Sequence, residues 1–134
     1  MFADRYQHAI TFQETISADA TRAIARAEGS CKVESVDVFN SAAVATHATN
    51  YITFKLINLG TDAQGTTVIA SASTSQTGGT AMAANVAFPL SVTAANALVA
   101  DGETIGFIYD EATTDVANSQ VINVVARVTP VGAP

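Results

Sequence analysis

Two histidines and one cysteine are the residues of this chain best suited to metal chemistry. His8, His47 and Cys31 are ligands of the kind that zinc accepts, but no two of them have the spacing of a metal-binding pair. His8 belongs to a segment with the alternation of a β-strand, and His47 belongs to a loop segment. We therefore expect structural or surface roles for the histidines, and neither a metal nor another cofactor.

An acidic loop and many serines raise two further possibilities. Asp110, Glu111 and Asp115 carry oxygen ligands that suit Ca²⁺, but their spacing does not match an EF-hand loop. A serine-rich chain can build a Ser-His-acid triad, yet the G-x-S-x-G elbow that signals one is missing from the sequence. We expect a solvated acidic loop, and a protein that is not an enzyme.

Residues 60–67, GTDAQGTT, nearly match the phosphate-binding loop G-x-x-x-x-G-K-[ST]. Thr66 stands where that loop needs a lysine, so the charge of a triphosphate would go unmet. A phosphate loop also leads into a helix, whereas the β-branched run that starts at Thr67 favours a strand. The segment is therefore interpreted as the connection of a hairpin.

The composition is that of one domain with few charges. A length of 134 residues suits a single domain. Hydrophobic residues make up 49% of the chain, many of them alanine, and charged residues only 13%, against roughly 25% in average domains. Two interpretations stay open: a surface that contacts other proteins, or the ordinary surface of a β-protein rich in Ala, Thr and Ser.

Charge and cysteine content argue against several classes of protein. The net charge is −6 and the six basic residues do not cluster, which disfavours nucleic-acid binding. A single cysteine cannot form an internal disulfide, and the start of the chain has no signal-peptide pattern. No run approaches the ~18 apolar residues of a membrane helix. We expect a soluble protein made in a reducing cytosol that binds neither nucleic acid nor membrane.

The elements that position these residues centre on residues 49–73. Two segments there alternate between apolar and polar residues, which predicts two strands with one face buried, joined by the loop at residues 60–65. One face is expected to hold Ile52, Phe54 and Leu56 in the first strand and Val68, Ala70 and Ala72 in the second, with Thr53, Lys55, Ile69 and Ser71 opposite. This pair is interpreted as the central hairpin of an all-β domain.

Similar alternation continues along the rest of the chain. It predicts strands at residues 8–16, 31–39, 85–92, 103–109 and 120–128. A β-bulge near Glu34 and Ser35 would restore the register of the second of these, and Pro89 indicates an edge position or a bend in the third. Residues 129–134 are not expected to continue a central strand. About eight short strands without a firm helix favour a β-sandwich or barrel.

Residues 17–29, SADATRAIARAEG, fit two structures. Alanine is a strong helix former, Ser17 suits a helix N-cap and Gly29 suits a helix end. However, large and small residues alternate from Thr21 to Arg26, as they would in a strand. Propensity alone favours the helix.

Several segments resemble the head decoration (cement) proteins of tailed bacteriophages. Around the hairpin these are THATNYITF at residues 46–54, INLGTD at 57–62 and GTTVIA at 65–70. TRAIARA at residues 21–27, FPLSV at 88–92 and VADGE at 99–103 support them on either side. The similarity covers residues 21–128, and it favours a strand over a helix for residues 17–29.

The resemblance implies a fold and a function. The fold would be an all-β, single-domain antiparallel β-sandwich, jelly-roll-like, with about eight strands over residues 17–130, after an N-terminal arm and first strand at 1–16 and before a tail at 131–134. The function would be that of a structural virion protein on the outer capsid surface, a homotrimer that braces the major capsid protein. We add the hypothesis that subunit contacts involve Phe2, Tyr6, Ile10 and Phe12, since this early apolar segment must pack on its own domain or on a neighbour.

Two alternatives belong to other classes of protein. One is a receptor- or glycan-binding β-sandwich module of a phage tail fibre or surface protein, for which Tyr51 is the plausible aromatic at the outer face of a strand. The other is a small hydrolase. A saccharide array and a screen of ester and glycoside substrates distinguish these from a decoration protein.

Overall fold

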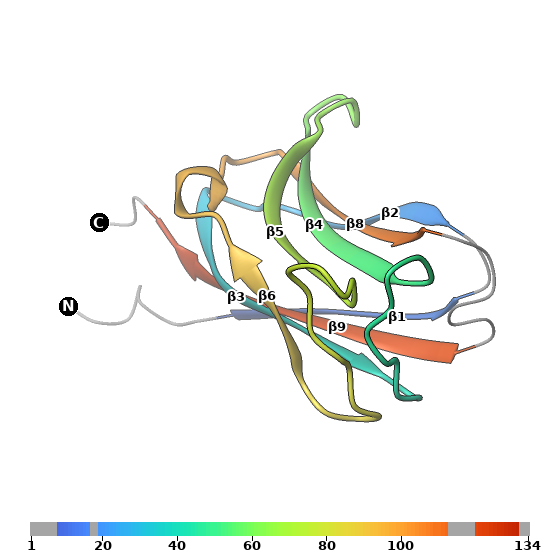
Figure 1. Cartoon of the computed structure of the whole chain (residues 1–134). Coiled ribbons are helices and arrows are strands. Elements are labelled where there is room, and N and C mark those ends of the chain that lie inside the picture. The colour runs from blue at the N-terminus through green and yellow to red at the C-terminus, as the bar shows by residue number, and fades with distance from the viewer. Residues whose placement is uncertain (1–7, 17–18, 113–119, 132–134) are drawn as a thin grey trace.

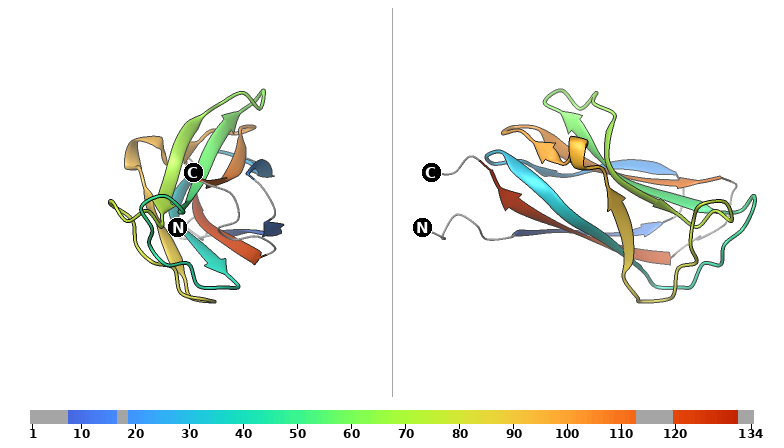
Figure 2. Two further views of the ribbon diagram at one scale, coloured as in Figure 1. Left: turned by 45° about the vertical axis from the view of Figure 1, so that its right-hand side comes forward. Right: turned by 60° about the vertical axis from the view of Figure 1, so that its left-hand side comes forward.

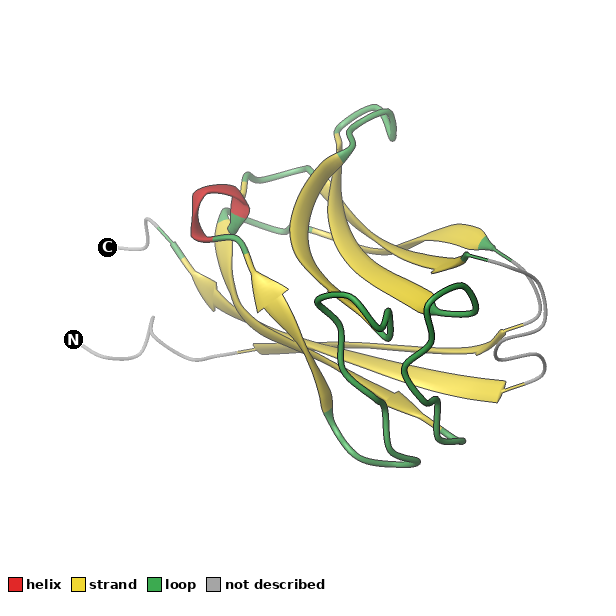
Figure 3. Cartoon of the chain, viewed as in Figure 1, coloured by secondary structure: helices red, strands yellow, loops and turns green. Residues whose placement is uncertain are grey.

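The computed structural model of this chain describes residues 8–16, 19–112 and 120–131. Among these residues the regular structure is nearly all strand, and the one helical element is a short 3-10 turn, η2 (Ala94–Asn96) (Figure 3). The strands are β1 (His8–Ile16), β2 (Ala20–Arg26), β3 (Cys31–Asn40), β4 (Ile52–Gly60), β5 (Thr67–Ser73), β6 (Phe88–Val92), β7 (Leu98–Val99), β8 (Thr104–Glu111) and β9 (Gln120–Pro130). The all-β prediction is confirmed.

The strands form an antiparallel sandwich with nested pairing. β4 pairs with β5, β3 with β6, β2 with β8 and β1 with β9, all antiparallel. This is the pattern of one long hairpin wrapped around a core, which defines a jelly roll. The strand order is β1-β9-β3-β6-β5-β4-β8-β2, and the two-residue β7 pairs with β3 at the side. The predicted jelly-roll-like sandwich is confirmed.

Two layers face each other across the core (Figures 1 and 2). One contains β1, β9 and β3, and the other contains β5, β4, β8 and β2. β6 joins the layers, because it pairs with β3 through residues 88–90 and with β5 through residues 91–92. Pro89, for which an edge position or a bend was predicted, lies within this crossing, and among the described strands β3 alone pairs with it, so this part of β6 is an edge.

The core lies between the layers and centres on Phe54. This side chain is 0% exposed, and its ring centroid lies 6.1 Å from that of Phe88, 6.0 Å from Phe107 and 5.7 Å from Tyr109. Since Phe88 comes from β6 and the other three from β4 and β8, the ring cluster ties the joining strand to the second layer. Fully buried aliphatic side chains from both layers fill the remaining space, among them Ile52, Leu56, Ile105, Ile122, Val36 and Val38.

Side chains rather than backbone pairing connect the layers at the opposite edge. β1 and β2 end the strand path, and each has one neighbour among the described strands. The Nε of Arg22 on β2 donates a hydrogen bond of 2.6 Å to Oε1 of Glu14 on β1. The ring of Phe12 on β1 lies 6.4 Å from that of Phe107 on β8. Because half of the Arg22 side chain is exposed, this ion pair contributes at most about 1 kcal/mol.

Residues 20–26 form a strand, as the resemblance implied and against the helix that propensity favours. β2 pairs with β8 along its length, with a register shift between Ala23 and Ala25. The shift leaves Ile24 as an extra residue, half-buried and packed against the core. Ladder hydrogen bonds and burial of Ile24 thus override the helix propensity of alanine. The predicted bulge in β3 is confirmed as well, since its register with β9 shifts between Val33 and Ser35.

Three predictions about strand limits or faces were wrong. β6 begins at Phe88 instead of residue 85, because Asn85 has a left-handed φ of 59° and Val86 is 55% exposed. Ile69 is buried beside Ala70, because a bulge places it as an extra residue between the pairs Leu56–Ala70 and Ile57–Val68. β9 continues through Pro130, where it pairs with Cys31 of β3.

Candidate functional site

The residues singled out for metal chemistry are spread over the fold. His8 is exposed at the start of β1, and Cys31 is buried at the start of β3. His47 lies in a loop, where its Nδ1 accepts hydrogen bonds from the backbone N–H groups of Thr49 at 3.0 Å and Asn50 at 2.9 Å. Within the described ranges, no three His, Cys, Asp or Glu residues form a group that could hold a metal ion. The histidine in the loop therefore shapes a turn.

The acidic loop separates in the structure. Asp115 lies outside the described residues. Asp110 and Glu111 are consecutive residues of β8, so their side chains point to opposite faces of the strand. The backbone N–H of Glu111 donates a 2.8 Å hydrogen bond to Oδ1 of Asp19, which ties the start of β2 to the end of β8. This bond gives Asp19 a structural role.

The loop that resembles a phosphate site closes the β4–β5 hairpin. The N–H of Gly65 donates to the carbonyl of Leu59 at 2.7 Å, and the N–H of Gln64 donates to Oδ1 of Asp62 at 3.0 Å. A Cβ on Gly65 would lie 2.5 Å from the carbonyl oxygen of Asn58, so the close approach of the backbone requires glycine there. Strand β5 follows, as predicted, and the N–H groups of Gln64 and Gly65 form hydrogen bonds within the turn.

The pKa shifts belong to groups of the core. Burial raises the pKa of the Cys31 thiol above its ordinary value. Burial, and then the nearby negative charge of Glu111, raises the pKa of the Tyr109 hydroxyl well above its usual range. Both groups are neutral at physiological pH, and a thiol held neutral is a poor nucleophile. They are core groups rather than reactive ones.

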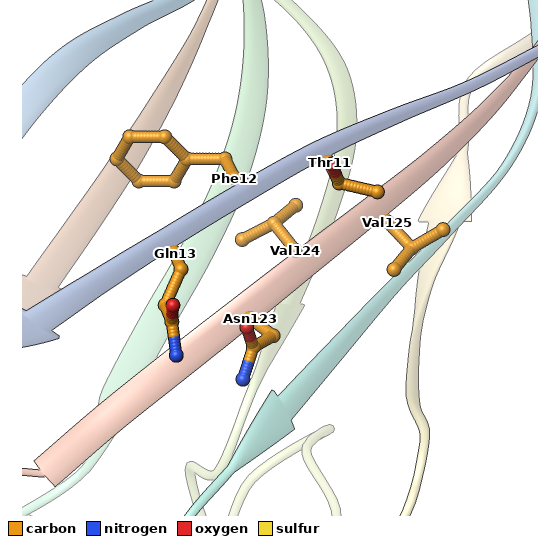
Figure 4. Close-up of a pocket in the computed structure, with 6 residues that line it drawn as sticks. All are labelled: Thr11, Phe12, Gln13, Asn123, Val124 and Val125. Carbon is orange, nitrogen blue, oxygen red and sulfur yellow. The ribbon is translucent and has the colours of Figure 1, made fainter.

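The four residues proposed for subunit contacts divide into two pairs. Phe2 and Tyr6 lie outside the described residues. Ile10 and Phe12 are half-buried on β1 and pack against the core cluster of their own domain. Figure 4 shows Phe12 on one side of β1 and Gln13 on the other. Ile10 and Phe12 thus have an intramolecular role, and their contact with another subunit stays a prediction.

A shallow hollow lies over β1 and β9, next to this first strand (Figure 4). Its volume is about 240 Å³, and its lining comes from cross-strand neighbours: Thr11, Phe12, Gln13, Asn123, Val124 and Val125. The amides of Gln13 and Asn123 lie on the same side of the sheet (Figure 4). The hollow belongs to the layer that carries the free edge of β1.

The charged residues are distributed unevenly along the chain. Between Asp37 and Asp101 the only charged residues are Lys55 and Asp62. This stretch supplies β4, β5, β6 and the loops at residues 41–51 and 74–87. We call the outer surface of β5 and β6, together with these two loops, the neutral face. Interface centres are depleted in charged residues relative to the remaining surface, and the neutral face shares this one feature with them.

The two loops of the neutral face are fixed to one another (Figure 3). Val44 and Met82 exchange backbone hydrogen bonds of 2.8 Å in both directions. The N–H of His47 donates to the carbonyl of Thr74 at 3.3 Å, and the N–H of Gln76 donates to that of His47 at 2.9 Å. Met82 is 2% exposed and anchors the loops to the core. Such a surface is ordered before it meets a partner, which lowers the entropic cost of binding.

A groove opens in the neutral face where β6 leaves β5. The two strands pair only through Ala70–Val92 and Ser71–Ser91, after which β6 turns to β3. The fork holds a groove of about 510 Å³, lined by Thr53, Ser71, Ala72, Ser73, Gly78, Gly79, Thr80, Pro89 and Ser91. None of these nine residues is charged or aromatic. We call this feature the fork groove.

Sequence reasoning did not find the fork groove. It placed Thr53 and Ser71 on the polar face of the hairpin, which is correct, but outward serines and threonines are common in β-proteins. The signal that was available is the long stretch with so little charge between Asp37 and Asp101. Tyr51, the aromatic considered for sugar stacking, is half-exposed and is not part of the groove lining.

Comparison with known proteins leaves the family open. No protein-family model matches the chain, and no curated protein matches it significantly. Among solved structures, an alpha-amino acid ester hydrolase aligns with 90% of this chain at 11% sequence identity and a TM-score of 0.31. The alignment spans 25% of the hydrolase chain, so this chain corresponds to about a quarter of that protein's length. A TM-score this low carries no argument about activity. No helix among the described residues is long and apolar enough to cross a membrane.

Proposed function

We propose that this chain is a structural virion protein, a capsid decoration (cement) protein that binds the outer surface of a tailed-phage head and stabilises it. Its partner is the major capsid protein, and its working form is a homotrimer. The observation that carries the proposal is the neutral face, a pre-ordered surface of two interlocked loops and two strands in a region with only Lys55 and Asp62 as charged residues. The sequence resemblance to decoration proteins points the same way.

The mechanism requires contact alone. A decoration protein repeats over a lattice, and a trimer engages several coat subunits at once. Linked contacts act as intramolecular events at high effective concentration, so weak single interfaces add up to firm attachment. Each bound trimer then holds neighbouring coat subunits together against outward pressure. The interlocked loops suit this role, since a surface that is already ordered transmits load without first folding.

The segment before β1 supplies the proposed contacts between subunits. Phe2 and Tyr6 are the aromatic residues of that segment, and Ile10 and Phe12 are large apolar residues that follow on β1. β1 pairs with β9 from His8 to Ile16, so deletion of residues 1–16 removes an integral strand as well as the arm. Deletion of residues 1–7 separates the two roles, because it leaves every described strand in place.

Binding to purified heads tests the function. The probe is the empty, expanded head assembled from the major capsid protein encoded in the same genome. We expect saturable co-sedimentation of the chain with these heads, and little loss of binding between about 0.05 and 0.5 M NaCl, because uncharged contacts are not screened by salt. The 1–7 deletion should keep the melting temperature and lose either the trimer mass or the binding. Absence of the wild-type chain from the head pellet contradicts the proposal.

A glycan-binding module of a tail fibre or surface protein is the second candidate. The hydroxyl-lined fork groove is the observation that favours it, since hydroxyl groups can hydrogen-bond to a sugar. The groove lining offers no aromatic ring for stacking on a sugar face. Selective binding on a saccharide array, together with no binding to heads, supports this candidate over the decoration protein.

A further inference from the structure

We infer that the fork groove is the place where this protein holds its partner, and that its occupant is an uncharged segment of the major capsid protein. The inference rests on the proposed function and adds the contact residues and the chemistry of the bound segment. It follows from the lining of the groove, from the way β5 and β6 separate, and from the charges of the competing occupants.

The lining favours a neutral polar ligand. Ser71 and Ser91 form a cross-strand pair at the last rung between β5 and β6, and both line the groove. A serine hydroxyl can donate a hydrogen bond to a ligand and accept one from it. The lining offers no charged side chain that could pair with a charged ligand, which favours an uncharged one.

The groove lies where β6 leaves β5. Among the described residues, β6 pairs with β5 only through residues 91–92 and then with β3 from Leu90 to Phe88. Beyond Ser71, the carbonyl of Ser73 on this side of β5 already accepts a hydrogen bond from the N–H of Thr80, so an occupant contacts the lining side chains rather than a free strand edge. The groove volume of about 510 Å³ lies within the ~300–1,000 Å³ typical of binding pockets.

The loop that walls the groove is held rigidly. The N–H of Thr80 donates to the carbonyl of Ser73 at 3.1 Å, and the N–H of Gly79 donates to the carbonyl of Ser75 at 3.0 Å. A Cβ on Gly79 would collide with the backbone of Ser73 and Ser75, so the loop packs as closely as a glycine allows. The groove therefore exists before a ligand arrives, and binding does not have to order its wall.

Charge distinguishes the possible occupants. The segment before β1 of a second copy contains Asp4 and Arg5, which do not suit a neutral groove. In register, Lys55 lies opposite Ser71 and Asp110 lies opposite Thr53. Asp37 lies opposite Pro89 and forms a 3.2 Å ion pair with Arg127. The charges that flank the groove therefore include both signs in equal number and favour neither an anion nor a cation. A neutral segment of the capsid surface meets both conditions.

The test introduces a negative or a positive side chain in the groove, and the same two side chains at a control position outside it. Ser91 is exposed on β6, and the variants are Ser91→Glu and Ser91→Lys. Thr21 is exposed on β2, in the other half of the second layer, and Thr21→Glu and Thr21→Lys are the matched controls. Each variant is mixed with the empty heads described above, and bound protein is measured by co-sedimentation, with the melting temperature as a check of folding.

We expect both Ser91 variants to bind about tenfold or more weakly, whichever the sign of the charge, and both Thr21 variants to bind within about twofold of the wild type. Wild-type affinity in the Ser91 variants overturns the inference while the proposed function stands. An effect of one sign only shows that the groove binds a charged segment, and overturns the neutral occupant. A changed oligomeric mass in the Ser91 variants assigns the groove to a second copy, which also overturns it. If the wild type itself does not bind heads, the proposed function fails first.

Discussion

Alanine substitution of two phenylalanines tests the way the core is built. Phe54 is 0% exposed and its ring contacts Phe88, Phe107 and Tyr109. Removal of a fully buried phenyl ring costs about 3–5 kcal/mol, because the lost transfer free energy is joined by the free energy of the cavity. The three ring contacts place Phe54→Ala at the upper end of that range. Such a loss is a large share of the ~5–15 kcal/mol that stabilises a typical domain.

Phe12 is the matched comparison at the open edge of the sandwich. Its side chain is half-buried, and its one ring contact among the described residues is with Phe107 at 6.4 Å. Full burial of a phenylalanine contributes about 1.5–3 kcal/mol, and water can enter the space left at an edge. Phe12→Ala should therefore cost about 1–2 kcal/mol of unfolding free energy. A loss of trimer mass beyond this effect would add support for the subunit contact proposed for Phe12.

Urea unfolding measures both values. The chain has no tryptophan and three tyrosines, so the transition is followed by tyrosine fluorescence and by far-ultraviolet circular dichroism. Phe54→Leu is the conservative control and should cost clearly less than Phe54→Ala, since it keeps most of the volume. Equal costs for Phe54→Ala and Phe12→Ala, or a cost below about 1.5 kcal/mol for Phe54→Ala, would refute the placement of Phe54 at the centre of the core.

Three further predictions concern stability, and urea unfolding measures each. Gly106→Ala should lower the unfolding free energy by about 1–3 kcal/mol, because the new alanine Cβ would lie 2.8 Å from Cδ1 of Leu59. The double variant Gly106→Ala/Leu59→Ala should lose less stability than the sum of the two single variants. Strictly additive losses would contradict the clash. Thr74→Val should cost about 1–3 kcal/mol, because Thr74 is 0% exposed and its Oγ1 accepts a 3.0 Å hydrogen bond from the N–H of Ile52; Thr74→Ser keeps that oxygen and should cost less. The unfolding free energy should fall as pH rises above about 10, because the unfolded chain releases the Tyr109 proton at the ordinary tyrosine pKa while the folded chain retains it. If the unfolding free energy of Tyr109→Phe falls equally steeply with pH, Tyr109 is not the cause.

The strands of the fold were largely predictable because most of them have one buried face. In β4, alternation correctly placed Ile52, Phe54 and Leu56 together on the buried face. The failures have local geometric causes that alternation does not register. A bulge turns Ile69 inward, and a left-handed Asn85 delays the start of β6. Residues 20–26 needed the resemblance, because the ladder with β8 that overrides their helix propensity comes from a distant part of the sequence.

The fork groove was beyond sequence reasoning for a different reason. It exists because β6 changes partner between Leu90 and Ser91, and no local pattern of residues encodes which distant strand takes over. Ser71 and Ser91 are ordinary outward residues until this change places them across from each other. The stretch of low charge between Asp37 and Asp101 was visible in the sequence. The structure adds that the strands of this stretch, β4, β5 and β6, are neighbours in the sheet.

Release of DNA from filled heads tests the stabilising role most directly. Heads packed with DNA, and lacking this protein, are heated with and without a saturating amount of the purified chain, and a fluorescent dye that cannot enter the intact head reports the released DNA. The account predicts a higher release temperature with the wild-type chain, and a smaller increase with Ser91→Glu at the same concentration. An unchanged release temperature at a concentration where the chain saturates the heads would contradict the role of a cement protein.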